Sequence, residues 1–280
     1  MKRLTGAAKL AGVTGWPVKH SKSPRMHGHW LNELQIDGAY LPLPIHPDQF
    51  QVAVRGLVAS GFQGMNVTIP HKEAAYEIAD TLSDAAKAIG AVNTLVFNSD
   101  GSIFGDNTDG FGFIENIRQS TPTFDFTKGP TLVLGAGGAA RAIIHGLLDA
   151  GAPQVYVSNR TLARAQSLEA MDPTKVQALP WEDRTMHCPN LNLLINTTSL
   201  GMSGQNPLEM ALDDLSATAL VTDIVYTPLQ TDLLKNAAER GNPTVDGIGM
   251  LLHQAVRGFS YWFGQTPTVT PELRKLMLAS

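Results

Sequence analysis

The chain has 280 residues, 43% of them apolar, which is enough for two packed domains or one large one. A net charge of −4 gives no reason to expect nucleic acid, and the single cysteine, Cys188, excludes a disulfide framework and a thiolate metal site. No apolar run approaches the roughly 20 residues that span a bilayer, and Lys9 and glycines interrupt the start, MKRLTGAAKLAG, so that a signal peptide is not expected. We therefore expect a cytoplasmic protein that contacts neither nucleic acid nor membrane.

The first part of the chain alternates between strand and helix patterns. The helix over 23–34 is expected to begin with Ser23 as its cap and Pro24 in its first turn, and a hairpin within 91–107 is expected to turn at Asp100-Gly101. Further strands are expected at 9–18, 39–45 and 64–69, and further helices at 46–61, 70–82 and 109–120. This order predicts an α/β sandwich with a mainly parallel sheet.

Residues 131–141, TLVLGAGGAAR, form an apolar run that breaks into glycines and resumes as a helix. Gly135 permits a tight turn, Gly137 lets the backbone approach a pyrophosphate, and Ala140 allows close packing of helix on strand. The free N–H groups at the start of the helix favour an anion. The pattern predicts a Rossmann-type dinucleotide-binding domain.

The next strand pattern, VYVSNRT at 155–161, indicates which dinucleotide binds. An NAD site usually ends this strand in an acid that holds the ribose 2′-hydroxyl, whereas here Asn159, Arg160 and Thr161 follow it, with Arg164 one turn later. A guanidinium pairs with a 2′-phosphate that a carboxylate would repel. We therefore predict NADP as the cofactor, and hydride chemistry. A methyltransferase, which can also use a glycine loop, would favour an acid at the ribose.

The remaining patterns complete two domains. Strands are expected at 131–135, 154–158, 177–180, 191–198 and 219–226, and helices at 249–264 and 271–278. Because the segment after 246 is too short for a domain, we expect its helices to return to the first one. The predicted domains are 1–110 with 247–280, which binds substrate, and 111–246, which binds NADP. The substrate is expected between them, facing the nicotinamide.

Polar side chains stand at the predicted strand ends of the first domain, where open α/β sheets bind ligands: Ser21, Ser23, Asn66, Thr68, Lys72, Asn93, Thr94, Asp106 and Asp109. Each has an ordinary structural interpretation, such as a helix cap for the serines and Asp109 or a solvated helix position for Lys72. Together they suit a polyhydroxylated ligand.

Lys72 and Asp109 are the predicted catalytic pair. A ketone reductase needs a proton donor beside the hydride acceptor and a cation for the developing alkoxide, and Lys72 can be both. Asp109 would keep the lysine charged unless burial opposes this. Which of the two moves the proton stays open, and the pair is treated as one coupled unit.

The eight histidines do not predict a metal site. His27 and His29 lie two apart, but no HExxH pattern occurs and no carboxylate stands at ligand spacing. Surface or helix-capping histidines are the preferred interpretation. No GxSxG pattern occurs either, so a serine hydrolase has no support.

Taken together, the motifs resemble the shikimate dehydrogenase family, NADPH-dependent enzymes that interconvert 3-dehydroshikimate and shikimate on the pathway to aromatic amino acids. The likeness covers nearly the whole chain in nine blocks: GWPVKHSKSP (15–24), NVTIPHK (66–72), GAVNT (90–94), NTDG (107–110), GAGGAAR (135–141), NRT (159–161), NTTSLGM (196–202), DIVYTPLQT (223–231) and DGIGMLLHQA (246–255).

The resemblance implies roles for matching positions. Ser21 and Ser23 are implied to bind the substrate carboxylate, and Lys72 and Asp109 to act at the reacting carbon. Partners of the ring hydroxyls or carboxylate are implied at Asn66, Thr68, Asn93 and Gln254, and a tyrosine reaching the substrate at Tyr226. Implied cofactor contacts are Gly135, Ala136, Gly137, Gly138 and Ala139 for the pyrophosphate, Asn159, Arg160, Thr161 and Arg164 for the 2′-phosphate, Ile224 and Gly247 for the nicotinamide half, and, more weakly, Asp84.

Some alternatives stay open. Gln254 could be a core amide, Tyr226 could be structural, and Thr197 and Ser199 could merely shape a loop. Gly28 departs from similar sequences, which often carry a larger polar residue there. A quinate/shikimate dehydrogenase that uses NAD would have an acid where Arg160 stands, and a dinucleotide-binding module without catalysis would not need the Lys–Asp pair. We expect a monomer or a homodimer.

Overall fold

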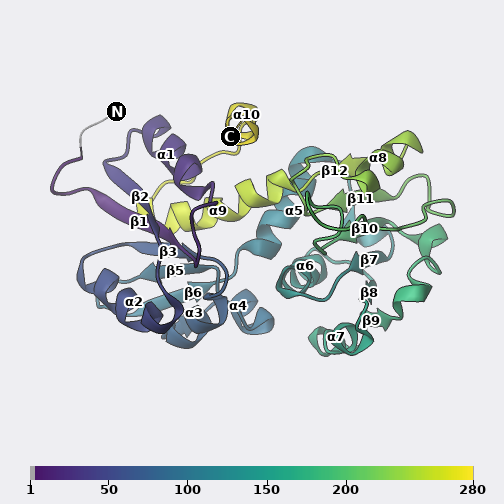
Figure 1. The fold of residues 1–280 in the computed structure, drawn as a ribbon, viewed down its shortest axis with the longest axis horizontal. Helices are drawn as coiled ribbons and strands as arrows, with labels where there is room; N and C mark the ends of the chain where they lie inside the picture. Colours follow the sequence, from purple (N-terminus) through teal and green to yellow (C-terminus); the bar gives the residue numbers. More distant parts are fainter. Residues whose placement is uncertain (1–3, 280) are drawn as a thin grey trace. The chain divides into compact units, whose positions relative to one another are not determined.

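The computed structural model, which describes residues 4–279, divides the chain into two compact α/β units (Figure 1). The first unit comprises the residues up to Thr108 together with those from Leu252 onward, and the second comprises Asp109–Leu251. These junctions differ from the predicted ones by two residues at the first crossing and five at the second. Residues 1–3 and 280, which the predicted substrate domain includes, lie outside the described residues.

The first unit is built on a mixed six-stranded sheet. Its order is β2 (Gly38–Leu43), β1 (Lys9–Thr14), β3 (Gly64–Val67), β5 (Thr94–Phe97), β6 (Ile103–Asp106) and β4 (Thr81–Leu82). β1 runs parallel to β2 and β3, and β4 runs parallel to β6, whereas β5 is antiparallel to both neighbours. The predicted parallel sheet is therefore interrupted by the predicted hairpin, which reverses the chain at Asp100-Gly101.

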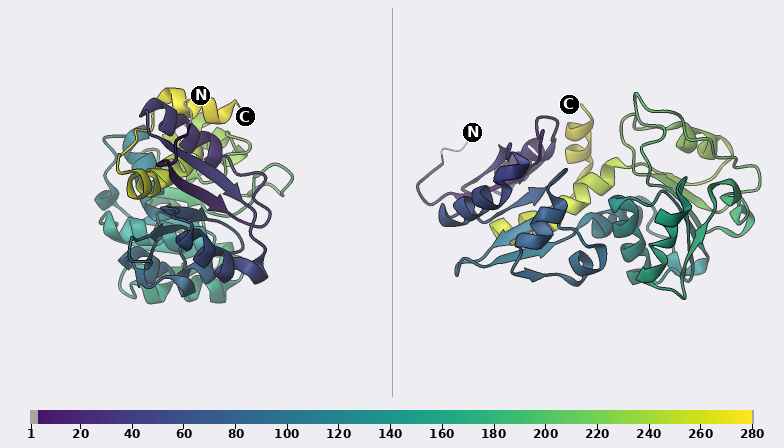
Figure 2. Two further views of the ribbon diagram at one scale, coloured as in Figure 1. Left: turned by 90° about the vertical axis from the view of Figure 1, so that its left-hand side faces the viewer. Right: turned by 60° about the horizontal axis from the view of Figure 1, so that its bottom comes forward.

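Helices cover both faces of this sheet. α1 (Ser23–Glu33), α9 (Ile248–Phe263) and α10 (Pro271–Leu278) contribute to one core, into which Ala11 and Val13 of β1 point. α2 (Phe50–Ala59), α3 (Lys72–Ile78) and α4 (Asp84–Ile89) contribute to the other, with Met65 and Val67 of β3. Figure 2 shows α10 beside α1, as expected for C-terminal helices that return to the first unit.

Two local expectations were wrong. Ser23 does not cap α1, because it is already the first helical residue, and the capping position belongs to Lys22 without a side-chain cap. The helix expected over 70–82 ends at Ile78, because Thr81 and Leu82 pair with β6 as the short strand β4. The chain then re-enters a helix at α4, whose first turn is capped by Ser83: its Oγ accepts the Ala86 amide at 3.1 Å.

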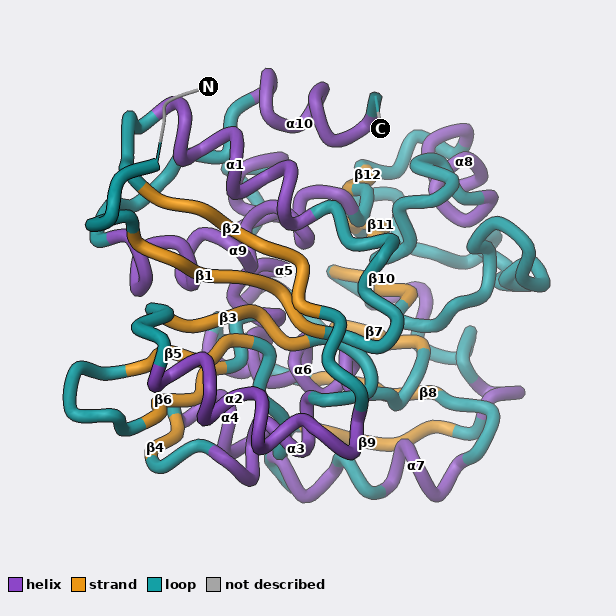
Figure 3. The backbone as a smooth tube through the Cα atoms, turned by 60° about the vertical axis from the view of Figure 1, so that its left-hand side comes forward, coloured by secondary structure: helices purple, strands orange, loops and turns teal. Residues whose placement is uncertain are grey.

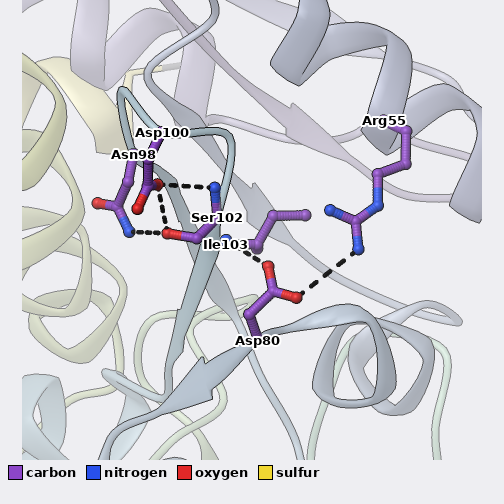
Figure 4. A network of polar contacts seen from close by, with 6 residues as sticks. All are labelled: Arg55, Asp80, Asn98, Asp100, Ser102 and Ile103. Atoms are coloured by element: carbon purple, nitrogen blue, oxygen red, sulfur yellow. Dashed lines mark hydrogen bonds and ion pairs between the residues drawn. The ribbon is translucent and has the colours of Figure 1, made fainter.

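A polar network fixes the β5–β6 hairpin (Figure 4). Asp100 Oδ1 accepts from the Ser102 amide at 2.9 Å and from its hydroxyl at 2.7 Å, and Asn98 Nδ2 donates to the same hydroxyl at 3.0 Å. Asp80 Oδ2 accepts the Ile103 amide at 2.8 Å. The turn glycine between these residues adopts φ +84°, which glycine reaches without steric cost. At the other end of the hairpin, Thr94 at the start of β5 pairs with Asp106 at the end of β6.

The second unit is built on an all-parallel six-stranded sheet, which confirms the predicted Rossmann-type fold (Figure 3). Its order is β12 (Thr244–Val245), β11 (Leu220–Asp223), β10 (Leu193–Asn196), β7 (Thr131–Leu134), β8 (Val155–Ser158) and β9 (Val176–Leu179). The strand order reverses between β7 and β10. Ligands of such sheets bind outside the carboxyl ends of the strands at this reversal.

The helices of the second unit pack on both faces of its sheet. α5 (Asp109–Ser120) and α6 (Gly138–Asp149) share one core with β7 and β8, and α8 (Asp232–Glu239) belongs to the other. α5 and α6 approach so closely at Gly110 that a Cβ there would clash with the Ala142 carbonyl oxygen. The second unit also contains the short helix α7 (Leu162–Gln166) and the 3₁₀ turns η2 (Phe126–Lys128), η3 (Glu169–Met171), η4 (Trp181–Asp183) and η5 (Cys188–Asn190). The first unit contains the 3₁₀ turn η1 (Pro47–Gln49). Within residues 4–279, none of the helices combines the length and apolarity that crossing a membrane requires.

Candidate active site

The polar residues predicted in the first unit gather at one edge of its sheet. β1 and β3 end at this edge, and β5 begins there because it runs antiparallel to β3. Backbone hydrogen bonds join the three segments: the Val67 amide donates to Asn93 O at 2.7 Å, and the Thr68 amide donates to Thr14 O at 2.9 Å. The gathered residues are Ser21 and Ser23 after β1, Asn66 and Thr68 at the end of β3, Lys72 as the first residue of α3, and Asn93 before β5.

Asn93 is held in one orientation. Its Oδ1 accepts from the Thr108 amide at 3.0 Å, from the Thr108 hydroxyl at 3.2 Å and from the Thr94 hydroxyl at 2.9 Å. Because the backbone amide can only donate, the atom facing it must be the oxygen of Asn93. The side-chain nitrogen is therefore the group that Asn93 would present to a ligand oxygen.

Asn66, 6% exposed, is held at both ends of its amide. Tyr40 donates its hydroxyl proton to Asn66 Oδ1 at 2.5 Å, and Asn66 Nδ2 donates to Thr94 Oγ1 at 3.2 Å. Tyr40 was not among the predicted site residues. It lies in the middle of a strand pattern, and nothing in the local sequence shows that its hydroxyl reaches the end of another strand.

The serine pair lies where β1 turns into α1. Ser23 is buried and Ser21 half-buried, and the Ser23 amide donates to Ser21 Oγ at 3.3 Å. Because Ser21 Oγ accepts this bond, its own proton can be donated to an anion. Lys22, between the two serines, donates to the Met277 carbonyl at 2.9 Å and so ties this turn to the end of α10.

Close packing holds Thr68, and a backbone hydrogen bond holds Lys72. A Cβ on Gly15 would lie 2.6 Å from Thr68 Cγ2, so only glycine lets the loop after β1 pass at this distance. Lys72 is half-buried, and its carbonyl accepts the Val92 amide at 3.0 Å. His71, just before it, is fixed by its Nε2 atom, 2.9 Å from Ile45 O, and burial lowers the pKa of its ring.

Gln254 lies half-buried on α9 in the same unit. Asp84 is also in this unit, as the first residue of α4, with its side chain fully exposed and 3.3 Å from Lys87 Nζ. Its weak assignment to the cofactor remains a prediction.

In the second unit, the glycine turn fits a pyrophosphate. Gly135 has φ +109°, and a Cβ there would lie 2.6 Å from Thr197 Oγ1, so the turn admits only glycine. Gly137 precedes α6 in an extended conformation without a side-chain cap among the described residues, which leaves the first amides of α6 to a ligand. Cβ atoms on Gly137 and Gly138 would meet no described atom within 4 Å, so a ligand can approach the backbone closely here. Ala136 lies in the turn, Ala139 is the second residue of α6, and Ala140 is buried in the core, as predicted.

The cationic residues follow β8, directly beside this turn. The Gly135 amide donates to Ser158 O at 2.8 Å, which joins the glycine turn to the last residue of β8. Asn159 Nδ2 donates to Thr161 O at 2.9 Å, and this bond shapes the turn that carries Arg160. Arg160 and Arg164 are both exposed to solvent. The arrangement can accept the 2′-phosphate of an NADP bound at the glycine turn.

The residues predicted for the nicotinamide half also come together. A Cβ on Gly247 would strike the Ile224 carbonyl oxygen, so these two backbones touch. Tyr226 is half-buried just beyond, and burial raises the pKa of its hydroxyl. Asp109, the first residue of α5, begins this unit, whereas Lys72 belongs to the other.

A buried carboxylate that the sequence analysis missed supports these loops. Asp223, the last residue of β11, accepts from the Val225 amide at 2.9 Å, Thr231 Oγ1 at 2.7 Å and Asn196 Nδ2 at 3.0 Å. Burial raises the pKa of Asp223, and these three hydrogen bonds oppose the rise. The sequence could have indicated this buried network, because Asn196, Asp223 and Thr231 all lie in two of the nine blocks, NTTSLGM and DIVYTPLQT.

The histidine interpretation was wrong for His27. It is neither a surface nor a capping residue, because its ring is completely buried. The His27 ring stacks in parallel on the Tyr40 ring, with ring centroids 3.8 Å apart and an interplanar angle of 2°. Its position on the inner face of α1, beside Met26 and Trp30, explains this. In residues 4–279 there is no cluster of three or more side chains that could hold a metal ion.

The fold and the glycine turn define the class: a dinucleotide-binding protein of the Rossmann type, with a second α/β unit that carries buried amide and hydroxyl groups. Comparisons with known proteins give the family. Residues 13–95 match the "Shikimate dehydrogenase substrate binding domain", residues 118–227 match "Shikimate / quinate 5-dehydrogenase", and residues 247–271 match the "Shikimate 5'-dehydrogenase C-terminal domain".

Individual relatives cover nearly the whole chain. A shikimate dehydrogenase (NADP(+)) of Paramagnetospirillum magneticum is 52% identical over 276 residues, which is 99% of this chain and 100% of the relative. Among solved structures, shikimate 5-dehydrogenase of Listeria monocytogenes, in complex with shikimate and NAD, has a TM-score of 0.90 and 31% identity, with 99% of each chain covered. Shikimate 5-dehydrogenase of Thermus thermophilus, in complex with NADP(H) and shikimate, has a TM-score of 0.84 and 34% identity, covering 97% of this chain and 98% of that one. The chain belongs to the shikimate/quinate dehydrogenase family.

Proposed function

We propose that this protein is an NADP-dependent shikimate dehydrogenase, which catalyses the reversible reduction of 3-dehydroshikimate to shikimate in the shikimate pathway. The full-length similarity to such an enzyme supports the reaction. The structural observation that carries the choice of cofactor is the position of Arg160, two residues after Ser158, whose carbonyl accepts the Gly135 amide of the glycine turn. A guanidinium at this place favours the additional phosphate of NADP over the ribose hydroxyl of NAD.

The second unit would bind the cofactor. The pyrophosphate would lie on the uncapped start of α6, over Gly135, Ala136, Gly137, Gly138 and Ala139, and the 2′-phosphate would lie on Asn159, Arg160, Thr161 and Arg164. Ile224 and Gly247 would contact the nicotinamide half. We also propose a weaker cofactor contact for Asp84.

The first unit would bind the substrate. Ser21 and Ser23 would donate hydroxyl protons to its carboxylate, and Asn93 would donate from its side-chain nitrogen, as its fixed orientation requires. Asn66, Thr68 and Gln254 would contact the ring hydroxyls or the carboxylate, and Tyr226 of the second unit would reach the substrate as well.

The chemistry requires a hydride and a proton. NADPH, when bound, supplies the hydride to the carbonyl carbon of 3-dehydroshikimate. As the C=O π electrons move to the oxygen, Lys72 would donate a proton to it and Asp109 would stabilise the protonated amine, the two acting as one coupled unit that water reprotonates. The lysine cation also stabilises the alkoxide as it forms.

The domain roles follow from these assignments. We propose that residues 1–110 and 247–280 form the substrate-binding domain and that 111–246 form the NADP-binding domain. We propose a cytoplasmic location, which the single buried Cys188 fits because a reducing compartment keeps such a thiol free. A monomer or homodimer is expected, and sedimentation equilibrium measures which.

An absorbance assay at the nicotinamide band tests the function, with shikimate or quinate paired with NADP or NAD. The expected result is the highest kcat/KM for shikimate with NADP. A preference for quinate with NAD would assign the protein to the other branch of the family. NADP binding by calorimetry without turnover in any of the four pairings would leave a dinucleotide-binding module and contradict the enzymatic proposal.

A further inference from the structure

Tyr40 contacts a predicted substrate-binding residue although it lies in the middle of β2, an edge strand of the first unit's sheet. Its side chain is buried, and its hydroxyl donates to Asn66 Oδ1 at 2.5 Å. From Asn66 the hydrogen bonds continue to Thr94 and then to Asn93. Four side chains from β2, β3 and the start of β5 thus form one continuous chain.

The direction of every bond in this chain follows from one backbone group. The Thr108 amide can only donate, so Asn93 presents its oxygen to it and to the neighbouring Thr94 hydroxyl, which must donate. With its proton used, Thr94 Oγ1 can only accept from Asn66, so the nitrogen of Asn66 faces Thr94.

The oxygen of Asn66 therefore faces Tyr40, and Tyr40 must donate to it. The hydroxyl of Tyr40 is the last donor of the chain and satisfies an acceptor that is almost fully buried. Aligned hydrogen bonds of this kind strengthen one another in a low-dielectric interior. Removing the last donor would loosen Asn66 first.

The surroundings of Tyr40 keep it in this role. The His27 ring stacks in parallel on the Tyr40 ring with the two centroids 3.8 Å apart, and the Trp262 ring centroid lies 5.9 Å from that of Tyr40. These contacts limit rotation of the tyrosine ring. Burial raises the pKa of Tyr40 well above its ordinary value, so the hydroxyl keeps the proton that it donates.

We propose that Tyr40 is a positioning residue of the substrate site, which acts through Asn66 by fixing the side-chain amide that the substrate hydroxyls or carboxylate meet. The proposal rests on the proposed function, because it assumes that Asn66 binds the substrate. Tyr40 itself need not touch the substrate.

The variant Tyr40→Phe tests this, because it keeps the ring and its stacking on His27 and removes only the hydroxyl. We expect the KM for shikimate to rise about 5- to 20-fold, the range expected when one buried hydrogen bond is lost, with a smaller change in kcat and an unchanged KM for NADP. The matched control is Tyr156→Phe, because Tyr156 stacks on His187 with the same geometry, 4.0 Å and 6°, in the second unit. The control should retain the parent's constants for both ligands.

A double-mutant cycle separates positioning from general loosening of the fold. If Tyr40 acts through Asn66, Tyr40→Phe should raise the KM for shikimate little further when Asn66→Ala is already present. Thr94→Val, which breaks the chain at its next link, should give the same selective rise in KM as Tyr40→Phe. Circular dichroism at the assay temperature establishes that each variant is folded.

Two outcomes would overturn the inference while the proposed function stands: a Tyr40→Phe enzyme whose KM for shikimate lies within twofold of the parent's, or effects of Tyr40→Phe and Asn66→Ala that simply multiply. A parent protein without turnover would instead count against the proposed function, before any variant is made.

Discussion

His27 should make the protein sensitive to acid, because its ring is buried without a charge partner. The ring lies among Tyr40, Trp30, Phe259 and Trp262, and neither ring nitrogen has a hydrogen-bond partner of normal geometry within residues 4–279. Burial lowers the pKa of His27 from 6.5 to about 3, and the nearby Asn66 amide offsets only part of that effect. The folded protein therefore holds His27 neutral at pH values where the unfolded chain binds a proton.

The sign and size of the effect follow from proton linkage. Since the folded pKa lies below the unfolded one, the stability associated with neutral His27 is complete above pH 6.5 and is lost as pH falls from 6.5 toward 3. At about 1.4 kcal/mol per pH unit, the loss between pH 7 and pH 5 comes to roughly 2 kcal/mol, a sizeable part of a typical unfolding free energy of about 5–15 kcal/mol.

The variant His27→Phe tests this, because phenylalanine retains an aromatic ring and cannot be protonated. Guanidinium unfolding at pH 7 and pH 5, followed by tryptophan fluorescence, measures the stability chiefly of the first unit, which contains Trp16, Trp30 and Trp262. The variant should lose about 2 kcal/mol less than the parent between the two pH values.

The comparison isolates one histidine. The lowered pKa of His71 contributes equally to both proteins and cancels. His29→Gln on the same helix changes a ring that is only partly buried and should keep the parent's acid sensitivity. If parent and His27→Phe lose the same free energy between pH 7 and pH 5, the buried neutral ring is not the cause and the reasoning fails.

Three further predictions concern the cofactor, the catalytic pair and the backbone. Arg160→Ala should weaken NADPH binding by roughly 10- to 150-fold, because a charge-assisted contact contributes about 1.5–3 kcal/mol. The affinity for NADH should stay nearly unchanged. A fluorescence titration in which both affinities fall equally would refute the 2′-phosphate assignment. Lys72→Ala should lower kcat by about 10²- to 10⁴-fold and hardly change the KM for NADPH, and undiminished turnover would exclude Lys72 as the proton donor. Gly56→Ala should raise the free energy of unfolding by about 0.5–1 kcal/mol, because a Cβ at this helical position would meet open space. Gly61→Ala should lower the free energy of unfolding by about 1–2 kcal/mol, because Gly61 has φ +77°. Denaturant midpoints of the two variants measure both effects.

Local sequence signals were sufficient where one segment determines its own structure. The run TLVL before Gly135 predicts strand, turn and helix without reference to any other segment, and Asp100-Gly101 predicts the hairpin in the same way. The order of these signals was enough for the two α/β domains and for the return of the C-terminal helices. The glycines are particularly informative, since Gly135 has a left-handed φ that other residues avoid.

Signals failed where distant segments decide the structure. Residues 79–82 continue a helical pattern, but pairing with β6 draws Thr81 and Leu82 into the sheet. His27 was misinterpreted because its burial depends on α9, more than 200 residues later in the chain, which supplies Phe259 and Trp262. Tyr40 was missed for the same reason: its role depends on where β3 ends.

The two sets of candidate residues differ in how they are held, and this difference predicts how mutations in each will behave. Asn66 and Asn93 are buried and already hydrogen-bonded to the protein, so changing either leaves buried partners unsatisfied and should lower stability as well as substrate affinity. Arg160 and Arg164 are exposed, so their removal should cost binding alone. Ligand-free melting temperatures should therefore fall for Asn93→Ala and stay within about a degree for Arg160→Ala, and a large fall for the arginine variant would show that the exposed turn after β8 supports the fold.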